Sequence, residues 1–245
     1  MKVKDGMKDI HKRAGTLGVI TARGGSKGIP GKNMYRVRGQ PLIGYCIEAA
    51  AASRAFDRII ISTDDPAIAA FAKSRGVEIP FMRPTDLAGD AVGHLPIMRH
   101  AVEWLERHEQ YRPEIVGIIV PTAPLVRAAD FDAAKKILVE SGADSVVGVK
   151  EVPFKYHPAK AFLEQEGFLT YGAGRAMRRQ DLPRAYYSAA AIYFFRTALL
   201  FREEPSLYGE RVLPYLMEDD LDINTMEDMR EFERRLCGAA EHEMT

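Results

Sequence analysis

The sequence carries no net charge and very little cysteine, and each absence excludes a class of protein. Lys plus Arg equals Asp plus Glu at 34 each, so a global attraction to nucleic acid or to an anionic membrane is not expected. Cys46 and Cys237 are the only cysteines, which argues against a disulfide framework or a zinc cluster, and we expect both to be buried in a reducing compartment. No apolar run approaches the length of a membrane span, and residues 1–15 lack the apolar core of a signal peptide. We therefore expect a cytoplasmic protein with neither nucleic acid nor membrane as a partner.

Short β-rich segments alternate with helix-length segments, and an apolar content of 47% is enough to form a core. The expected strands are 17–20, 58–62, 78–82, 115–120 and 145–149, and the expected helices between them are 41–53, 66–75, 96–109 and 129–141. This alternation predicts an α/β fold with a mostly parallel sheet and crossover helices. Ligands of such sheets bind at the carboxyl ends of the strands.

From about residue 151 the pattern changes, because 151–188 is rich in proline, glycine, aromatic residues and cations. We interpret 151–188 as an excursion from the sheet. Strands are expected again at 190–195 and 212–217, followed by an amphipathic helix at 226–236. The predicted organisation is an N-terminal extension (1–16) and one domain (17–240) that carries the excursion.

The stretch "VITARGGSKGIPGKN", residues 19–33, leads from a strand into a loop of glycines and cations. Its spacing fits neither a Walker A loop nor the dinucleotide fingerprint. No acidic residue occurs between Asp9 and Glu48, whereas seven cations do: Lys12, Arg13, Arg23, Lys27, Lys32, Arg36 and Arg38. Glycines let backbone N–H groups approach an anion, and the cations add charge-assisted bonds to phosphate oxygens. The loop is thus a candidate phosphate site, the alternative being a solvated basic loop.

The stretch "EDDLDINTMED", residues 218–228, concentrates carboxylates after the last expected strand. Asp222, together with Asn224 or Asp220, is a candidate site for Mg²⁺, which prefers oxygen ligands. Thr225 and Asp228 have the spacing of a capping box and explain part of the cluster structurally. A basic glycine loop and an acidic pair together suit a nucleoside triphosphate held with magnesium.

Six motifs carry a resemblance to a known family: "ARGGSKGIPGKN", "ISTDD", "RPTDLAGD", "PTAPL", "RQDLPRAYY" and "DINTMED". In their order and spacing, the sequence over about 17–236 resembles the acylneuraminate cytidylyltransferases. The resemblance implies a nucleotidyltransferase (Rossmann-like, GT-A-like) fold and a homodimer formed through 151–188. It also implies transfer of CMP from CTP to the anomeric hydroxyl of a 2-keto-3-deoxy sugar acid, with Mg²⁺ or Mn²⁺ as cofactor and pyrophosphate as product.

The same resemblance assigns roles to individual residues. Arg23, Lys27 and Lys32 match cations that hold the triphosphate, and Asp222 matches the first metal-binding aspartate. The implied nucleotide-binding set is Ala22, Arg23, Gly24, Gly25, Ser26, Lys27, Lys32, Asn33, Arg83 and His94. Lys155, Arg179, Gln180 and Tyr193 are the implied contacts of the sugar acid. Arg83 could instead be a strand-end salt-bridge partner, Tyr193 a core aromatic residue and His94 a structural residue.

Four positions depart from the family pattern. Val120 stands where the family has a glutamine that contacts the sugar, and Asn224 stands where it has the second metal-binding aspartate. Ala189 replaces an asparagine, and His94 replaces a serine. The departures leave the acceptor, and to a lesser degree the base, open. Two alternatives follow: a sugar nucleotidyltransferase that uses another nucleotide or a sugar 1-phosphate, and a nucleotide-binding regulator without catalysis.

Overall fold

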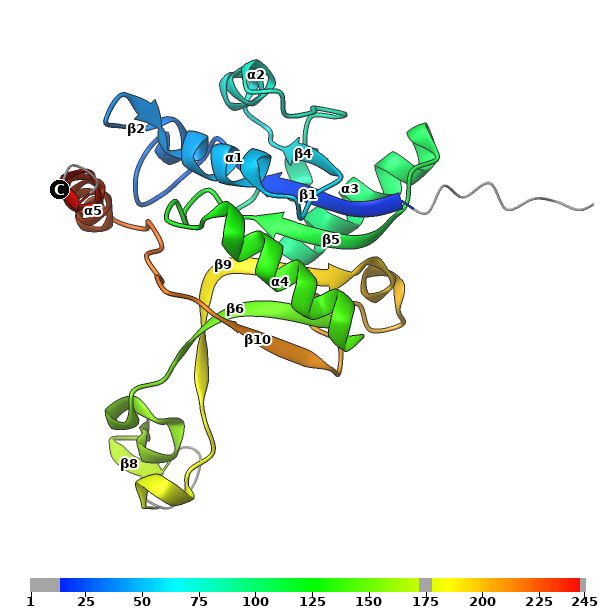
Figure 1. Cartoon of the computed structure of the whole chain (residues 1–245). Helices are drawn as coiled ribbons and strands as arrows, with labels where there is room; N and C mark the ends of the chain where they lie inside the picture. The colour runs from blue at the N-terminus through cyan, green and yellow to red at the C-terminus, as the bar shows by residue number, and fades with distance from the viewer. Residues whose placement is uncertain (1–13, 172–177, 243–245) are drawn as a thin grey trace, which may run out of the picture.

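The computed structural model describes residues 14–171 and 178–242 and is built on a six-stranded sheet in the order β10-β6-β9-β5-β1-β4 (Figure 1). The strands are β1 (Ala14–Thr21), β4 (Arg58–Ser62), β5 (Pro113–Ile119), β6 (Ser145–Glu151), β9 (Tyr186–Arg196) and β10 (Val212–Leu216). Strand β1 is parallel to β4 and β5, and β10 is parallel to β6. Strand β9 runs antiparallel to both of its neighbours, β5 and β6. The predicted α/β class with a mostly parallel sheet is therefore confirmed.

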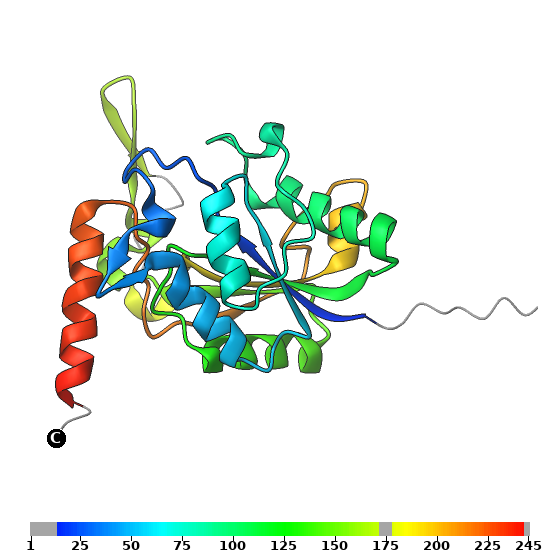
Figure 2. The same ribbon diagram turned by 90° about the horizontal axis from the view of Figure 1, so that it is seen from above.

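Helices cover both faces of the sheet, as crossover connections between parallel strands require. They are α1 (Leu42–Ala52), α2 (Pro66–Ser74), α3 (His94–Glu109) and α4 (Ala128–Ser141), whereas α5 (Met226–His242) packs in a separate cluster. Seen from above, α3 lies on one side of the sheet, and α1 and α4 lie on the other (Figure 2). Each of these helices was predicted, with ends displaced by a few residues.

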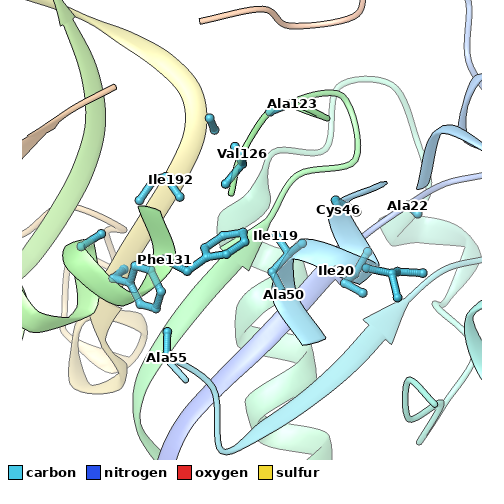
Figure 3. Close-up of a cluster of buried hydrophobic side chains, with 14 of the residues drawn as sticks. Ile20, Ala22, Cys46, Ala50, Ala55, Ile119, Ala123, Val126, Phe131 and Ile192 are labelled. Atoms are coloured by element: carbon cyan, nitrogen blue, oxygen red, sulfur yellow. The ribbon is translucent and has the colours of Figure 1, made fainter. Parts of the chain in front are cut away.

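Two hydrophobic clusters fill the space between the sheet and these helices. Ile119 of β5 belongs to the cluster under α1, α2 and α4, which also contains Phe131 and Ile192 (Figure 3). The preceding residue, Ile118, belongs to the cluster under α3. Successive strand side chains point to opposite faces, so a continuously apolar strand is what a sheet covered on both sides needs.

Two paired glycines make room for an aromatic side chain in the larger cluster. Gly18 of β1 lies opposite Gly117 of β5, and a Cβ on either would lie within 2.9 Å of the Phe56 ring. Phe56 also stacks on Phe194 with ring centroids 5.5 Å apart. The glycines thus let one aromatic ring lie flat against two adjacent strands.

The expectation of a strand at 78–82 was wrong. Only Glu78 forms a bridge, to Ile60 of the edge strand β4. Pro80 lacks the N–H that a longer ladder needs, and the chain then turns away into the short 3-10 helix η2 (Thr85–Leu87). The segment is an edge connection and adds no strand to the sheet.

Two further expectations need correction. Strand β1 begins at Ala14, so it starts inside the region assigned to the N-terminal extension. Cys46 is buried as expected, but Cys237 is exposed on α5. The apolar face that α5 buries does not include Cys237. It contains Met229 and Phe232, which pack beside Ile29 and Ile223 in a third cluster.

The excursion leaves the sheet after β6 and returns through β9 (Figure 1). Its described elements are η3 (Phe154–Tyr156), η4 (Pro158–Lys160), the hairpin β7 (Phe162–Gln165) and β8 (Phe168–Tyr171), and η5 (Arg179–Asp181). It projects away from the sheet rather than forming another layer on it. The remaining short elements are η1 (Lys32–Met34), β2 (Arg36–Val37), β3 (Gln40–Pro41) and η6 (Thr197–Phe201).

No helix within 14–171 and 178–242 combines the length and the apolar character needed to cross a membrane.

Candidate active site

A cavity of about 310 Å³ opens beyond the carboxyl ends of β1 and β5. It lies where ligands of parallel sheets are expected. Its lining residues are Thr21, Arg23, Ser26, Lys27, Gly28, Lys32, Asn33, His94, Val120, Pro121, Thr122 and Asn224. The structure therefore brings most of the predicted nucleotide-binding residues, and the candidate metal residue Asn224, to one cavity.

The start of the basic loop is held in shape by its neighbours. Ala22 is buried and its N–H donates to the Ser62 carbonyl over 3.2 Å. The Gly24 N–H donates to Asp64 Oδ1 over 3.0 Å. The buried Asn33 donates from Nδ2 to the Arg23 carbonyl over 2.9 Å. Asn33 thus fixes the loop backbone as well as lining the cavity.

Arg23 and Lys27 share one carboxylate partner at the cavity. Asp90 Oδ1 lies 2.5 Å from an Arg23 terminal nitrogen, and Asp90 Oδ2 lies 2.7 Å from Lys27 Nζ. The hydrogen bond from Lys27, followed by that from Arg23, holds the pKa of Asp90 below its usual value. Two cations of the loop therefore converge closely enough to bind one anionic group.

Lys32 lines the cavity but has a backbone partner. Its Nζ donates to the Ile223 carbonyl over 2.6 Å, which ties the basic loop to the acidic segment. Burial lowers the pKa of Lys32, and the nearby Asp222 carboxylate partly opposes this effect. Lys32 thus joins two segments that are 191 positions apart, and its contact with a triphosphate stays a prediction.

Gly28 packs against the same acidic segment. A Cβ at Gly28 would lie 2.5 Å from the Asn224 carbonyl oxygen, so only glycine fits without a shift of the backbone. The Ile223 N–H donates to the Thr122 carbonyl over 2.8 Å, which connects the segment to the "PTAPL" motif after β5. The three motifs therefore meet through backbone contacts.

Arg83 is buried and is not among the residues that line the cavity. Its guanidinium donates from Nε to Ser62 Oγ over 3.0 Å and from a terminal nitrogen to the Ser62 carbonyl over 2.5 Å. Burial lowers the pKa of Arg83 to about 10, with Arg23 adding to the effect and Asp64 opposing it. These bonds brace the end of β4, and contact with the nucleoside stays a prediction.

His94 and Tyr193 form one side of the site. His94 is the first residue of α3, and its ring centroid lies 6.1 Å from that of Tyr193 on β9. Burial, and then the charge of Arg83, lower the pKa of His94, so the imidazole is neutral at pH 7. The Tyr193 hydroxyl lies 3.0 Å from Ser188 Oγ, and burial raises the pKa of Tyr193.

The predicted capping box is present at the start of α5. The Asp228 N–H donates to Thr225 Oγ1 over 3.3 Å, and the Thr225 N–H donates to Asp228 Oδ2 over 2.7 Å. These bonds fix the turn that follows Asp222 and Asn224.

Asp222 has one oxygen suited to a cation. Asn224 donates from Nδ2 to Asp222 Oδ2 over 2.8 Å, whereas the buried Asp222 Oδ1 has no hydrogen-bond partner among the described residues. Asp220 is exposed, and its Oδ2 accepts a hydrogen bond of 2.5 Å from the Tyr187 hydroxyl. The described residues contain no group of three or more His, Cys, Asp or Glu residues that could hold a metal ion. Mg²⁺ prefers oxygen ligands and is often bound through one or two carboxylates, and its binding at Asp222 stays a prediction.

The predicted cations for the sugar acid belong to the excursion, and Lys155 is not among the residues that line the cavity. Lys155 is exposed, with Nζ 5.3 Å from the centre of the Tyr156 ring. Gln180 is exposed, and the side chain of Arg179 lies outside what the structure describes. Tyr193 lies close to the cavity through its ring contact with His94, which lines it.

Sequence reasoning missed three kinds of residue at the site. Thr21 ends β1, and Pro121 and Thr122 come shortly after β5, so all three line the cavity from strand ends that the predicted strands could have identified. Asp64 holds the loop at Gly24, and Asp90 bridges two cations. Both aspartates stand in motifs recognised above.

Comparison with known proteins gives the family. The profile of the family described as Cytidylyltransferase matches residues 17–241. A pseudaminic acid cytidylyltransferase of Campylobacter jejuni is 32% identical over 218 residues, with 87% of this chain and 92% of the relative covered. An N-acylneuraminate cytidylyltransferase of Streptococcus agalactiae is 31% identical over 217 residues, which cover 86% of this chain and 50% of that longer relative.

Solved structures share the fold at lower identity. A CMP:2-keto-3-deoxy-manno-octonic acid synthetase complexed with CTP superposes with a TM-score of 0.68 at 15% identity, covering 92% of this chain and all of the other. A 4-diphosphocytidyl-2C-methyl-D-erythritol synthase of Anaerococcus prevotii gives a TM-score of 0.60 at 12% identity, over 91% and 96% of the two chains. The chain is therefore a nucleotidyltransferase enzyme and belongs to the acylneuraminate cytidylyltransferase family.

Proposed function

We propose that this enzyme transfers CMP from CTP to the anomeric hydroxyl of a nonulosonic acid and releases pyrophosphate. The observation that carries the proposal is the convergence of Arg23 and Lys27 on one carboxylate at the strand-end cavity. Two cations that can hold one anionic group there are suited to phosphate oxygens. The names of the relatives supply the nucleotide and the class of acceptor.

The proposed division of labour follows the placement of the side chains. Arg23 and Lys27 bind the β- and γ-phosphates and orient the triphosphate for attack on the α-phosphate. Asn33 holds the loop backbone that presents these cations. Neutral His94, which also lines the cavity, offers a ring surface to the nucleoside and places no further positive charge there.

We propose that Mg²⁺ or Mn²⁺ binds at Asp222, because its partnerless buried oxygen needs a cation or a hydrogen-bond donor. The bound ion would screen negative charge on the attacked phosphate and on the leaving pyrophosphate. Asn224 orients the Asp222 carboxylate through its side-chain amide. Asp220 is the second candidate ligand, and its bond to Tyr187 makes it less available.

For the acceptor we propose pseudaminic acid ahead of sialic acid. The pseudaminic acid cytidylyltransferase matches over nearly its whole length. Val120 gives the cavity an apolar group where the sialic acid pattern has an amide, so a hydroxyl-rich side chain of the acceptor would lose a hydrogen bond there.

We further propose a homodimer assembled through 151–188. Leu163 and Phe168 lie on one face of the β7–β8 hairpin and are 59% and 75% exposed, and Leu169 on the other face is 68% exposed. An isolated two-stranded hairpin is marginally stable in water, so these side chains need a covering surface. In a dimer, Lys155, Arg179 and Gln180 of one subunit would approach the cavity of the other and meet the sugar carboxylate.

Pyrophosphate release tests the proposal directly. The purified protein is assayed with each of CTP, UTP, ATP and GTP, against pseudaminic, legionaminic and sialic acids and a sugar 1-phosphate. We expect turnover with CTP and a nonulosonic acid. Preference for another nucleotide or for the sugar 1-phosphate would favour the pyrophosphorylase alternative, and tight nucleotide binding without turnover would favour the regulator.

A further inference from the structure

Asp90 occupies the atoms of Arg23 and Lys27 that the proposed function assigns to the triphosphate. Each Asp90 oxygen lies on a different cation, at 2.5 Å and 2.7 Å. Direct ion pairing at these distances leaves no room for a phosphate oxygen between the partners. While Asp90 is paired in this way, it takes one donor from each cation and partly neutralises the charge that a triphosphate would meet.

The pairing is exposed enough to be displaced. The Lys27 side chain is 83% exposed and that of Asp90 is 41% exposed. Exposed ion pairs contribute little net stability, because water and salt screen them. A triphosphate carries several negative charges where Asp90 carries one, so it competes for both cations at once.

Resting on the function proposed above, we propose that Asp90 is an internal competitor: it neutralises Arg23 and Lys27 in the empty site and is displaced by the triphosphate. The carboxylate then returns to the cations as pyrophosphate leaves. Asp90 thereby lowers the affinity of the site for pyrophosphate and for smaller anions. These anions carry fewer negative charges than the triphosphate and compete less well with the Asp90 carboxylate. It is a positioning residue and takes no part in the chemistry.

The position of Asp90 in the chain links this exchange to the cavity wall. Asp90 lies between η2 and α3, four residues before His94, and Gly89 and Gly93 stand near it on either side. Glycine permits backbone changes that other residues resist. The connection that leads to His94 can therefore adjust when Asp90 leaves the cations.

Removal of the charge with retention of shape gives the test. Asp90→Asn is compared with wild type and with Asp86→Asn, a variant in the same connection that removes an exposed carboxylate for which no contact to Arg23 or Lys27 is observed. Calorimetric titration with CTP and with pyrophosphate, each with Mg²⁺, reports the dissociation constants. We expect Asp90→Asn to bind both about threefold to tenfold more tightly and Asp86→Asn to match wild type.

A double-mutant cycle separates competition from a general change in charge. In a Lys27→Ala background the gain from Asp90→Asn should shrink, because one of the two competed cations is gone. If the wild-type enzyme turns over and Asp90→Asn binds CTP no more tightly than wild type, the inference fails. The proposed function stands in that case. If wild type binds neither probe, the proposed function fails and the inference fails with it.

Discussion

Gly28 lies against the carbonyl of Asn224, so that a Cβ at position 28 would stand 2.5 Å from that oxygen. This contact joins the basic loop to the acidic segment at the edge of the cavity that both line. It makes the two halves of the site dependent on each other.

Gly28→Ala should therefore impair catalysis while leaving the fold in place. The added methyl group must push the loop or the 222–224 segment aside, and a misplacement of about 1 Å can cost on the order of a hundredfold in rate. We expect kcat/KM to fall by at least about tenfold, with a thermal unfolding midpoint close to that of wild type. Unchanged kinetics would mean that the two segments are not held together during turnover.

Lys27→Ala should lower kcat/KM by about tenfold to a hundredfold, the loss expected for one charge-assisted contact to phosphate. Lys27 is largely exposed, so stability should not change. Lys73→Ala, an exposed lysine in the last turn of α2, is the matched control and should behave as wild type. A Lys27→Ala enzyme with the wild-type rate would remove the loop from the phosphate site.

Asp222→Asn keeps the size of the side chain and removes its charge, so metal-dependent activity should fall by orders of magnitude with folding intact. Asn224→Asp should restore a carboxylate pair and lower the Mg²⁺ concentration needed for half-maximal rate. Mg²⁺ titration of the rate in each variant gives both answers. If Asp222→Asn stays near the wild-type rate, Asp220 is the next ligand to test.

Assembly is testable at the hairpin. Light scattering should give about twice the chain mass of 27.3 kDa for wild type. Leu163→Arg combined with Phe168→Glu should give the mass of one chain, since charged groups at a buried apolar contact are costly. Met82→Glu, at an exposed methionine far from the hairpin in sequence, should leave the mass unchanged. A monomeric wild type would contradict the assembly.

The sequence was most informative where motifs follow strands. The loop after β1 and the turn before α5 were both located from residue types and spacing, and the Thr225–Asp228 cap formed as predicted. The antiparallel direction of β9 was not predictable, because a long excursion can return the chain in either direction. The strand predicted at 78–82 failed because apolar composition does not show whether a neighbouring strand is available on that side.

The site shows the same limit. The sequence does not show whether a lysine in a basic loop contacts a ligand or a backbone carbonyl. Lys32 donates a hydrogen bond to the carbonyl of Ile223, which is far away in sequence. Asp90 stood inside a recognised motif, but its meeting with Arg23 and Lys27 depends on how the connection to α3 folds back. Contacts between distant segments follow from tertiary packing, which residue types alone do not give.

The place of β9 in the sheet also has a consequence for the order in which the chain matures. Strand β6 contacts only β9 and β10 within the sheet, and β9 alone joins that pair to β5, β1 and β4. During synthesis β6 therefore stays separate from β5, β1 and β4 until residues 186–196 have left the ribosome, and its other neighbour, β10, is made later still. Until then β5 and β6 each present an unpaired edge, the kind of surface that favours aggregation. The excursion is made just before β9, so the hairpin β7–β8, whose contacts are local, can form while β6 is still separate from β5, β1 and β4.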